Sequence, residues 1–281
     1  MIHYAMIVAA TVLFSLQFVF NRGYERECGS GWPVARHFVL IAAAIGAVLM
    51  LALNGFTLEF SWFSALLALG SATVNILYTY ASIQAFAVAN LSMYSMFAML
   101  GGMLLPYVLG ICLGEELKLT GMLCCLLITV SLLLTVEKGH AKKGALKFYL
   151  LVFFLNGMSG VLATLHQGHE AAVSSNAYLF LGRTMTVIIC LVSLLLDKNR
   201  SFTISLKAVG FSVGYALFSC GGNLLLLLAL LHVPASVQYP IVTGGVIVLS
   251  ALVDLLRKEK VTPKTWIAVA IAFAASVAIA L

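Results

Sequence analysis

The sequence reads NRGYE at residues 21–25 and HQGHE at residues 166–170, two polar segments that lie 145 positions apart and share a glycine and a glutamate. Each follows an apolar run of about 20 residues, the length of a membrane-spanning helix. Four more matches follow in the same order: Ala35-Arg36 with Gly182-Arg183, Asn75 with Asn223, Tyr94 with Tyr239, and Gly101-Gly102 with Gly244-Gly245. Five ordered matches indicate an internal duplication.

The composition places this duplication in a membrane. Apolar residues make up 62% of the 281 residues, and charged residues make up 9%. A soluble domain carries about 45–50% apolar and about 25% charged residues. The composition therefore excludes a soluble globular protein, a disordered chain and a nucleic-acid-binding protein. The net charge of +6 rests on too few side chains to form a surface for a polyanion.

The apolar sequence predicts an all-α membrane protein with ten transmembrane helices. We expect the spans at 3–21, 33–53, 61–84, 89–112, 119–136, 146–166, 175–196, 204–230, 233–256 and 263–281. The longest break is basic and lies almost at the midpoint of the chain. It predicts a first five-helix repeat over 1–137, a basic linker over 138–147 and a second repeat over 148–281.

An odd number of spans determines how the two repeats are related. A unit of five helices leaves the membrane on the side opposite its entry, so the second copy must be inverted relative to the first. Inverted repeats are typical of alternating-access transporters, which bind their substrate near the bilayer midplane between the repeats. The sequence therefore predicts a secondary transporter with a central site.

Short motifs also point to a known family. They are Asn21 near the end of the first span, Arg36 opening the second and echoed by Arg183, Tyr78-Thr79-Tyr80-Ala81 ending the third, Gly114-Glu115 closing the fourth, and Lys258-Glu259-Lys260-Val261-Thr262-Pro263 before the last. In these features the chain resembles the ten-helix members of the drug/metabolite transporter (DMT) superfamily, with two EamA-type repeats. The resemblance implies that spans one to four and six to nine line a central cavity, with five and ten peripheral.

Basic residues predict which loops share a side of the membrane. Thirteen of the sixteen lie in or beside four loops on one side: Arg22, Arg26, Lys138, Lys142, Lys143, Lys147, Lys198, Arg200, Lys207, Arg257, Lys258, Lys260 and Lys264. Cytoplasmic loops hold the excess of Lys and Arg, which places both termini outside. The family resemblance implies both termini inside. The two arguments agree only that the termini share one side.

Acidic residues avoid the middle of every predicted span, and Asp254 lies in the last turn of the ninth. Members of the related small multidrug resistance family bind cations on a membrane-embedded glutamate. No such glutamate is found in this sequence, so proton-coupled export of hydrophobic cations is the less favoured alternative.

Arg183 is the most unusual polar residue, because it lies about nine residues into the span 175–196. A buried arginine needs a partner, and its planar guanidinium suits a carboxylate or phosphate. Arg183 is therefore a candidate anchor for an anionic or zwitterionic substrate. The alternatives are a structural bond to backbone carbonyls or to a loop carboxylate, and a side chain that snorkels to the interface. Arg36, only four residues into its span, is a second candidate that could instead reach the interface.

Amide and phenol side chains complete the candidate site. Asn75 and Asn223 form a repeat-related pair near mid-span, where an amide lines a cavity or joins two helices. Tyr78, Tyr94 and Tyr239 suit the aromatic wall of a metabolite cavity, although tyrosine is also common at membrane interfaces. The remaining candidate substrate-binding residues are Gln17, Asn156 and His166.

No catalytic set, nucleotide loop or zinc-ligand spacing is found in the sequence, so we expect no cofactor, metal or enzymatic activity. The expected function is secondary transport of a small polar metabolite across the cytoplasmic membrane, with amino acids, other zwitterions and anions favoured. The expected partners are this substrate, the lipid bilayer, and a counter-substrate or a coupling proton, carried by His166 or His37. The protein would act as a monomer or homodimer. A channel or a membrane enzyme is a further alternative.

Overall fold

The computed structural model of the protein describes residues 2–87, 91–114, 122–123, 126–127, 129–130, 145–197, 205–257 and 263–280. Within these ranges the chain is helical and contains no strand. The long helices are α1 (Ile2–Cys28), α2 (Trp32–Leu53), α3 (Trp62–Phe86), α4 (Leu91–Cys112), α6 (Ala145–Gln167), α7 (Ser175–Leu196), α8 (Leu206–Leu230), α9 (Ala235–Leu256) and α10 (Pro263–Ala280). Most of the predicted span 119–136 lies outside the described residues.

Eight of these helices are long and apolar enough to cross a membrane. This agrees with the predicted all-helical, multi-pass membrane class. The predicted boundaries of the helices α2 to α4 and α6 to α10 agree with the observed ones to within about two residues, because the polar breaks contain helix caps and turns. Ser61 and Ser174 are N-caps whose hydroxyl oxygens accept hydrogen bonds from the backbone N–H three residues later.

Helix α1 is longer than predicted, and this corrects the placement of Arg22 in a loop. The helix continues through Arg22 to Cys28 and ends before Gly29, whose φ of 77° suits glycine. Arg22 is buried, and its Nη1 lies 3.0 Å from Oδ1 of Asp254 in α9. The ion pair offsets part of the cost of burying the guanidinium, so a charged residue is tolerated within the helix.

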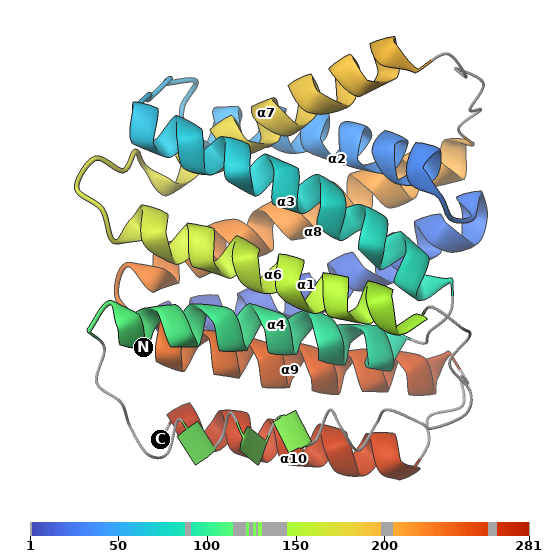
Figure 1. The fold of residues 1–281 in the computed structure, drawn as a ribbon, viewed down its shortest axis with the longest axis vertical. Helices are drawn as coiled ribbons and strands as arrows, with labels where there is room; N and C mark the ends of the chain where they lie inside the picture. The colour runs from blue at the N-terminus through green and yellow to red at the C-terminus, as the bar shows by residue number, and fades with distance from the viewer. Residues whose placement is uncertain are drawn as a thin grey trace.

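The helices of the first and second halves of the chain interleave (Figure 1). Helix α1 packs on α8 and α9, and α6 packs on α3 and α4. Helix α2 packs on α7 and α8, α3 on α7, and α4 on α9. Helix α10 packs on α9 at the edge of the bundle. Contacts between the halves therefore form most of the core.

Glycines allow the closest of these contacts. A Cβ on Gly101 of α4 would overlap the backbone carbonyl of Phe153 in α6, and a Cβ on Gly214 of α8 would overlap the ring of Phe20 in α1. Small residues let helix backbones approach in this way in membranes. A Cβ on Gly210, four residues before Gly214, would meet no atom of the described residues within 4 Å. Of these two glycines, only Gly214 therefore lies where a Cβ would strike a neighbouring helix.

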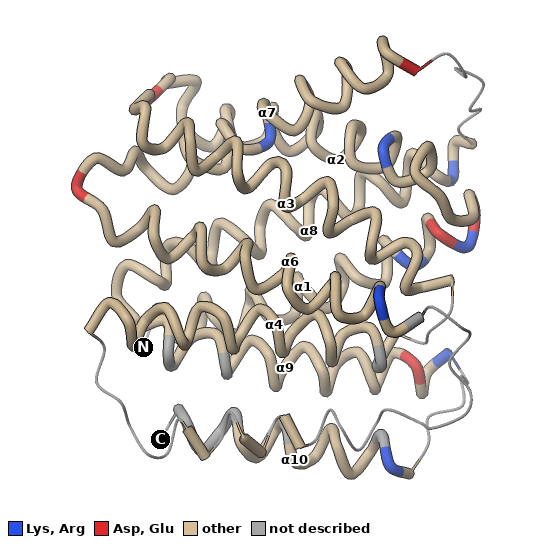
Figure 2. Tube along the Cα trace, viewed as in Figure 1, with Lys and Arg blue, Asp and Glu red and all other residues tan. Residues whose placement is uncertain are grey.

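Charge is distributed unevenly along the bundle. Figure 2 shows that Lys and Arg gather at the end where α1 and α9 end and where α2, α6, α8 and α10 begin. The one basic residue of α7, Arg183, lies in the interior of that helix and is buried. Helix α1 begins and α10 ends at the opposite end (Figure 1), so the chain enters and leaves the bundle on the same side.

Candidate functional site

A cavity of about 170 Å³ lies between the two halves of the chain. Seven of the described helices line it: α1, α3 and α4 from the first half, and α6 to α9 from the second. Its polar lining residues are Gln17, Ser71, Asn75, Tyr78, Asn156, Ser159, Tyr178, Arg183, Thr186, Tyr215, Ser219, Asn223, Tyr239 and Thr243. Arg183 carries the charge of this lining, and no Asp or Glu among the described residues faces it.

Arg183 is 8% exposed and lines the cavity from α7. Its Nη2 donates a 3.0 Å hydrogen bond to Oγ of Ser219 in α8. No carboxylate within the described ranges pairs with its guanidinium. The predicted structural alternative, a bond to a carbonyl or a loop carboxylate, therefore differs from the observed contact, which is a single hydroxyl.

Helix α2 makes room for the Arg183 side chain. A Cβ on Gly46 would lie 3.3 Å from both Cδ and Nε of Arg183, and 2.8 Å from Sγ of Cys220. No residue of α2, which is described throughout, lines the cavity. The expectation that the second span lines the site is therefore wrong, and α2 instead supports α7 from behind.

The predicted asparagine pair lies at the cavity. Asn75 in α3 and Asn223 in α8 both line it. Nδ2 of Asn223 donates to the carbonyl oxygen of Ser219 at 2.7 Å, which places the amide beside the serine that contacts Arg183. Arg183, Ser219 and Asn223 therefore form one polar face of the cavity.

Sequence reasoning missed several hydroxyl groups of this site. Ser219 lies four residues before Asn223, and Ser71 lies four residues before Asn75, so each shares a helix face with its asparagine. Oγ of Ser71 lies 2.6 Å from the hydroxyl of Tyr178, another lining residue. The four-residue spacing from the asparagines, repeated in both halves, is the signal that could have found both serines.

The predicted tyrosines occupy two layers. Tyr78 and Tyr239 line the cavity. Tyr94 is fully buried behind Tyr78, and its hydroxyl lies 2.6 Å from that of Tyr78 and 2.7 Å from Oγ of Ser82. Tyr94 therefore supports the wall and does not face the cavity.

Two of the remaining candidates are amides that reach the cavity. Asn156 in α6 donates a 2.6 Å hydrogen bond to the carbonyl oxygen of Ala98 in α4, so it also joins two helices. Gln17 in α1 lines the cavity with a buried Oε1 that has no hydrogen-bond partner among the described residues. An unpaired acceptor at this position suits a donor group on a bound molecule.

His166 lies one layer away from the cavity. Its side chain is fully buried, with Nε2 3.0 Å from Oγ of Ser64, and its ring stacks on Tyr178 at 3.8 Å. Tyr178 lines the cavity, but His166 does not. A role in carrying a coupling proton stays a prediction.

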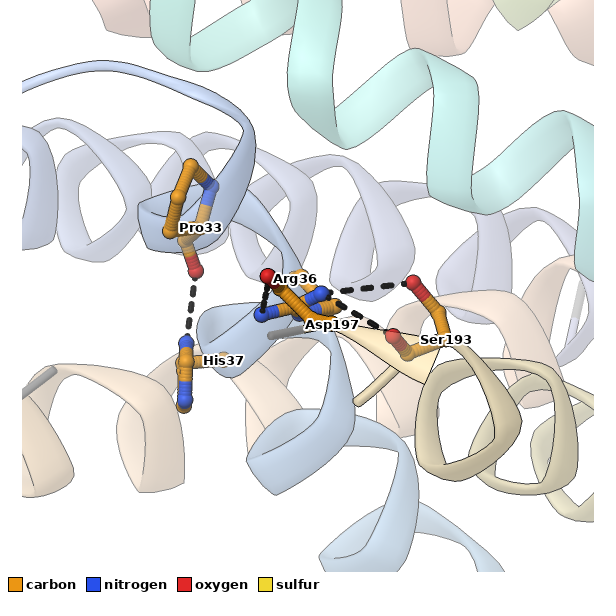
Figure 3. A network of polar contacts seen from close by, with 5 residues as sticks. All are labelled: Pro33, Arg36, His37, Ser193 and Asp197. Carbon is orange, nitrogen blue, oxygen red and sulfur yellow. Dashed lines mark hydrogen bonds and ion pairs between the residues drawn. The ribbon is translucent and has the colours of Figure 1, made fainter. Parts of the chain in front are cut away.

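The structure does not bring Arg36 to the cavity, so its assignment as a substrate-binding residue is corrected. Figure 3 shows its guanidinium facing the end of α7, where Nη2 lies 2.7 Å from Oδ2 of Asp197. Its Nη1 donates to the carbonyl oxygen of Ser193 at 3.2 Å. Asp197 neutralises the charge, and the pair joins α2 to α7.

The chemistry available at the site is that of binding. One fixed positive charge, several amides and hydroxyls, and an aromatic and aliphatic wall can hold a small molecule with an anionic group. Within the part of the chain that is described, no three His, Cys, Asp or Glu side chains lie close enough to hold a metal ion.

No protein-family model and no curated protein matches the chain. Among solved structures, the chain is similar to one described only as "Crystal structure of protein", with a TM-score of 0.63. The match covers 98% of this chain and 95% of that chain at 16% sequence identity. At this identity the likeness concerns the fold alone, so function must be argued from the cavity.

Proposed function

We propose that the protein is a secondary transporter that moves a small polar metabolite across the cytoplasmic membrane by alternating access. Amino acids, other zwitterions and anions are the favoured substrates. The observation that carries this proposal is Arg183, whose charge faces a cavity between the two halves and has a serine hydroxyl as its hydrogen-bond partner.

The energetics of a membrane-embedded charge support a ligand at this position. An ionisable residue inside a bilayer is costly and is retained mainly where it serves substrate or ion binding. A guanidinium forms its strongest contacts with carboxylates and phosphates, in bidentate geometry. A bound anion would supply the negative charge that no described side chain supplies to Arg183.

We further propose that the chain consists of ten helices in two inverted five-helix repeats, in an EamA-like arrangement. The packing supports this proposal. If each helix is exchanged for the one five positions later or earlier, the contact of α1 with α8 becomes that of α6 with α3. Likewise, α4 with α6 becomes α9 with α1, and α3 with α7 becomes α8 with α2.

The distribution of contacts along the bundle supports alternating access. The lining residues of α7 and α9 begin about one turn after the start of each helix, at Tyr178 and Tyr239. At the opposite end of the same helices, the ion pairs Arg22–Asp254 and Arg36–Asp197 join the halves. Rocking of the halves would separate these pairs as the cavity becomes accessible from their side.

Export of organic cations is the second candidate that the sequence left open. The cationic lining opposes it, because Arg183 would repel such a substrate. A channel would pass current in a planar bilayer, whereas a transporter would show slow, saturable flux.

The test is a thermal-shift screen of purified protein against a metabolite library, followed by flux of each ligand into proteoliposomes. We expect Arg183→Ala to weaken ligand binding about 10- to 100-fold, because a charge-assisted hydrogen bond is lost. Arg183→Lys should weaken ligand binding less than Arg183→Ala does, since lysine keeps the charge but not the planar pair of donors. Lys207→Ala, at an exposed site at the start of α8, is the matched control. Unchanged affinity in both Arg183 variants would contradict the proposal.

A further inference from the structure

Gly182 lies beside Arg183 in α7 and lines the same cavity. A Cβ placed on Gly182 would meet no atom of the described residues within 4 Å. Its φ is not positive, so the backbone does not require glycine there. Glycine in a helix interior makes the helix less stable than alanine does, so another property of this site must favour glycine.

Close packing is not that property. Gly101, Gly214 and Gly222 each lie against a neighbouring helix that a Cβ would strike. Gly182 has no such neighbour, and it stands in the middle of the lining face of α7. Tyr178 lies one turn before it and Thr186 one turn after it, and both also line the cavity. Any side chain at position 182 would therefore project into the cavity.

We infer that Gly182 is a specificity-determining residue: it keeps open the space beside the Arg183 guanidinium that the organic group of a small carboxylate occupies. The inference rests on the proposed function and adds to it a place for each part of the substrate. The carboxylate binds Arg183, next to Ser219, and the group attached to it lies over Gly182. The size of the residue at position 182 then limits the size of that group.

The test needs no knowledge of the natural substrate. The variant Gly182→Cys is treated with two small thiol reagents, the anionic sulfonatoethyl and the cationic trimethylammonioethyl methanethiosulfonate. Each rate is divided by the rate of the same reagent with free cysteine. We expect this normalised rate to be about ten times higher for the anionic reagent than for the cationic one, because the neighbouring guanidinium attracts the anion. Any change in the thiol pKa affects both reagents equally and cancels in this ratio.

Two variants serve as controls for this measurement. Adding Arg183→Gln to Gly182→Cys should abolish the preference for the anionic reagent. Ile188→Cys, on the same helix, replaces a residue that is 50% exposed and does not line the cavity. Ile188→Cys should face lipid and react with neither reagent, because methanethiosulfonates attack the hydrated thiolate. The inference would be overturned if Gly182→Cys did not react with either reagent. It would also be overturned if the ratio of the two normalised rates stayed the same when Arg183→Gln is added.

Stability gives an independent readout. If Gly182 only holds space, Gly182→Ala raises the melting temperature by about 1–3 °C, because helix propensity improves and no contact is lost. If Gly182 has a packing role instead, the same change lowers the melting temperature and the inference fails. Neither readout depends on transport. A charge-selective cysteine at position 182 without flux of any carboxylate would contradict the proposed function and leave this subsite in place.

Discussion

At the scale of single residues, Arg36 near the start of α2 and Arg183 in the interior of α7 have opposite environments. Arg36 is 2% exposed and paired with Asp197, whereas Arg183 is 8% exposed and lines a cavity. The same side chain is thus structural in one place and available to a ligand in the other. What separates the two is the presence of a carboxylate at the end of the neighbouring helix.

The pair between Arg22 and Asp254 leads to a prediction at this scale. Asp254 is fully buried, so Asp254→Asn would remove the negative charge that offsets the Arg22 guanidinium without adding solvent. Breaking a buried ion pair in this way costs about 3–5 kcal/mol. We expect a marked fall in the melting temperature of the detergent-solubilised protein. Glu170→Gln, at an exposed site, is the control, and equal melting temperatures for the two variants would contradict this account.

At the scale of helices, backbone proximity determines which pairs form the core. Helices α4 and α6 meet through Gly101 and Gly157, and a Cβ on Gly157 would lie 2.5 Å from the carbonyl oxygen of Gly101. Such contacts replace the hydrophobic effect, which does not drive helix association within lipid. The wall of the cavity depends on them, because α4 and α6 both line it.

Gly101→Ala should therefore destabilise the fold. Its Cβ would overlap the Phe153 carbonyl, a backbone atom that cannot move aside, so α4 and α6 must separate. The cost expected for overpacking is about 1–3 kcal/mol. Gly210→Ala is the matched control, since a Cβ there would meet nothing within 4 Å. In thermal unfolding, the melting temperature of Gly101→Ala should be well below that of Gly210→Ala. The reverse order would show that the interface between α4 and α6 is not tightly packed.

At the scale of the whole molecule, the two ends of the bundle are joined differently. Two ion pairs connect the halves at the end rich in basic residues. At the other end, the loop before α3 meets the loop before α7. Glu59 accepts hydrogen bonds from the Ser174 backbone N–H at 2.8 Å and from its hydroxyl at 2.7 Å. Its carboxylate also lies at the positive end of the α7 dipole.

This contact predicts an acid-sensitive part of the stability. The hydrogen bonds from Ser174 hold the pKa of the Glu59 carboxyl below its ordinary value of about 4.5. A carboxyl whose pKa is lower in the folded state stabilises the fold above its ordinary pKa and loses this effect as the pH falls through the folded-state value. Glu59→Gln should therefore lower the melting temperature at pH 7 and change it little near pH 3. An equal effect at both pH values would contradict the assignment.

Composition and the positions of the polar breaks are enough to predict the helical class and most helix boundaries. A run of about 20 apolar residues between polar breaks can satisfy its backbone in lipid only as a helix, so α7 was predicted correctly at both ends. The cost of polar groups in lipid also made many of the residues that line the cavity predictable. Of the ten candidate residues, seven line it: Gln17, Asn75, Tyr78, Asn156, Arg183, Asn223 and Tyr239. A polar group in an apolar span turns inward, whatever its partner.

The partner of each polar group depends on how the helices pack, and the sequence does not predict it. Arg36 and Asp197 are 161 positions apart, and no local pattern relates them. Tyr94 lies behind Tyr78 because the packing of α3 and α4 brings their hydroxyls together. Ser219 of α8 belongs to the site because it accepts a hydrogen bond from Arg183 of α7. Burial is a local consequence of composition, whereas pairing depends on how distant helices pack. The sequence could therefore show that Arg183 is buried, but not that it faces a cavity in which no described carboxylate lies.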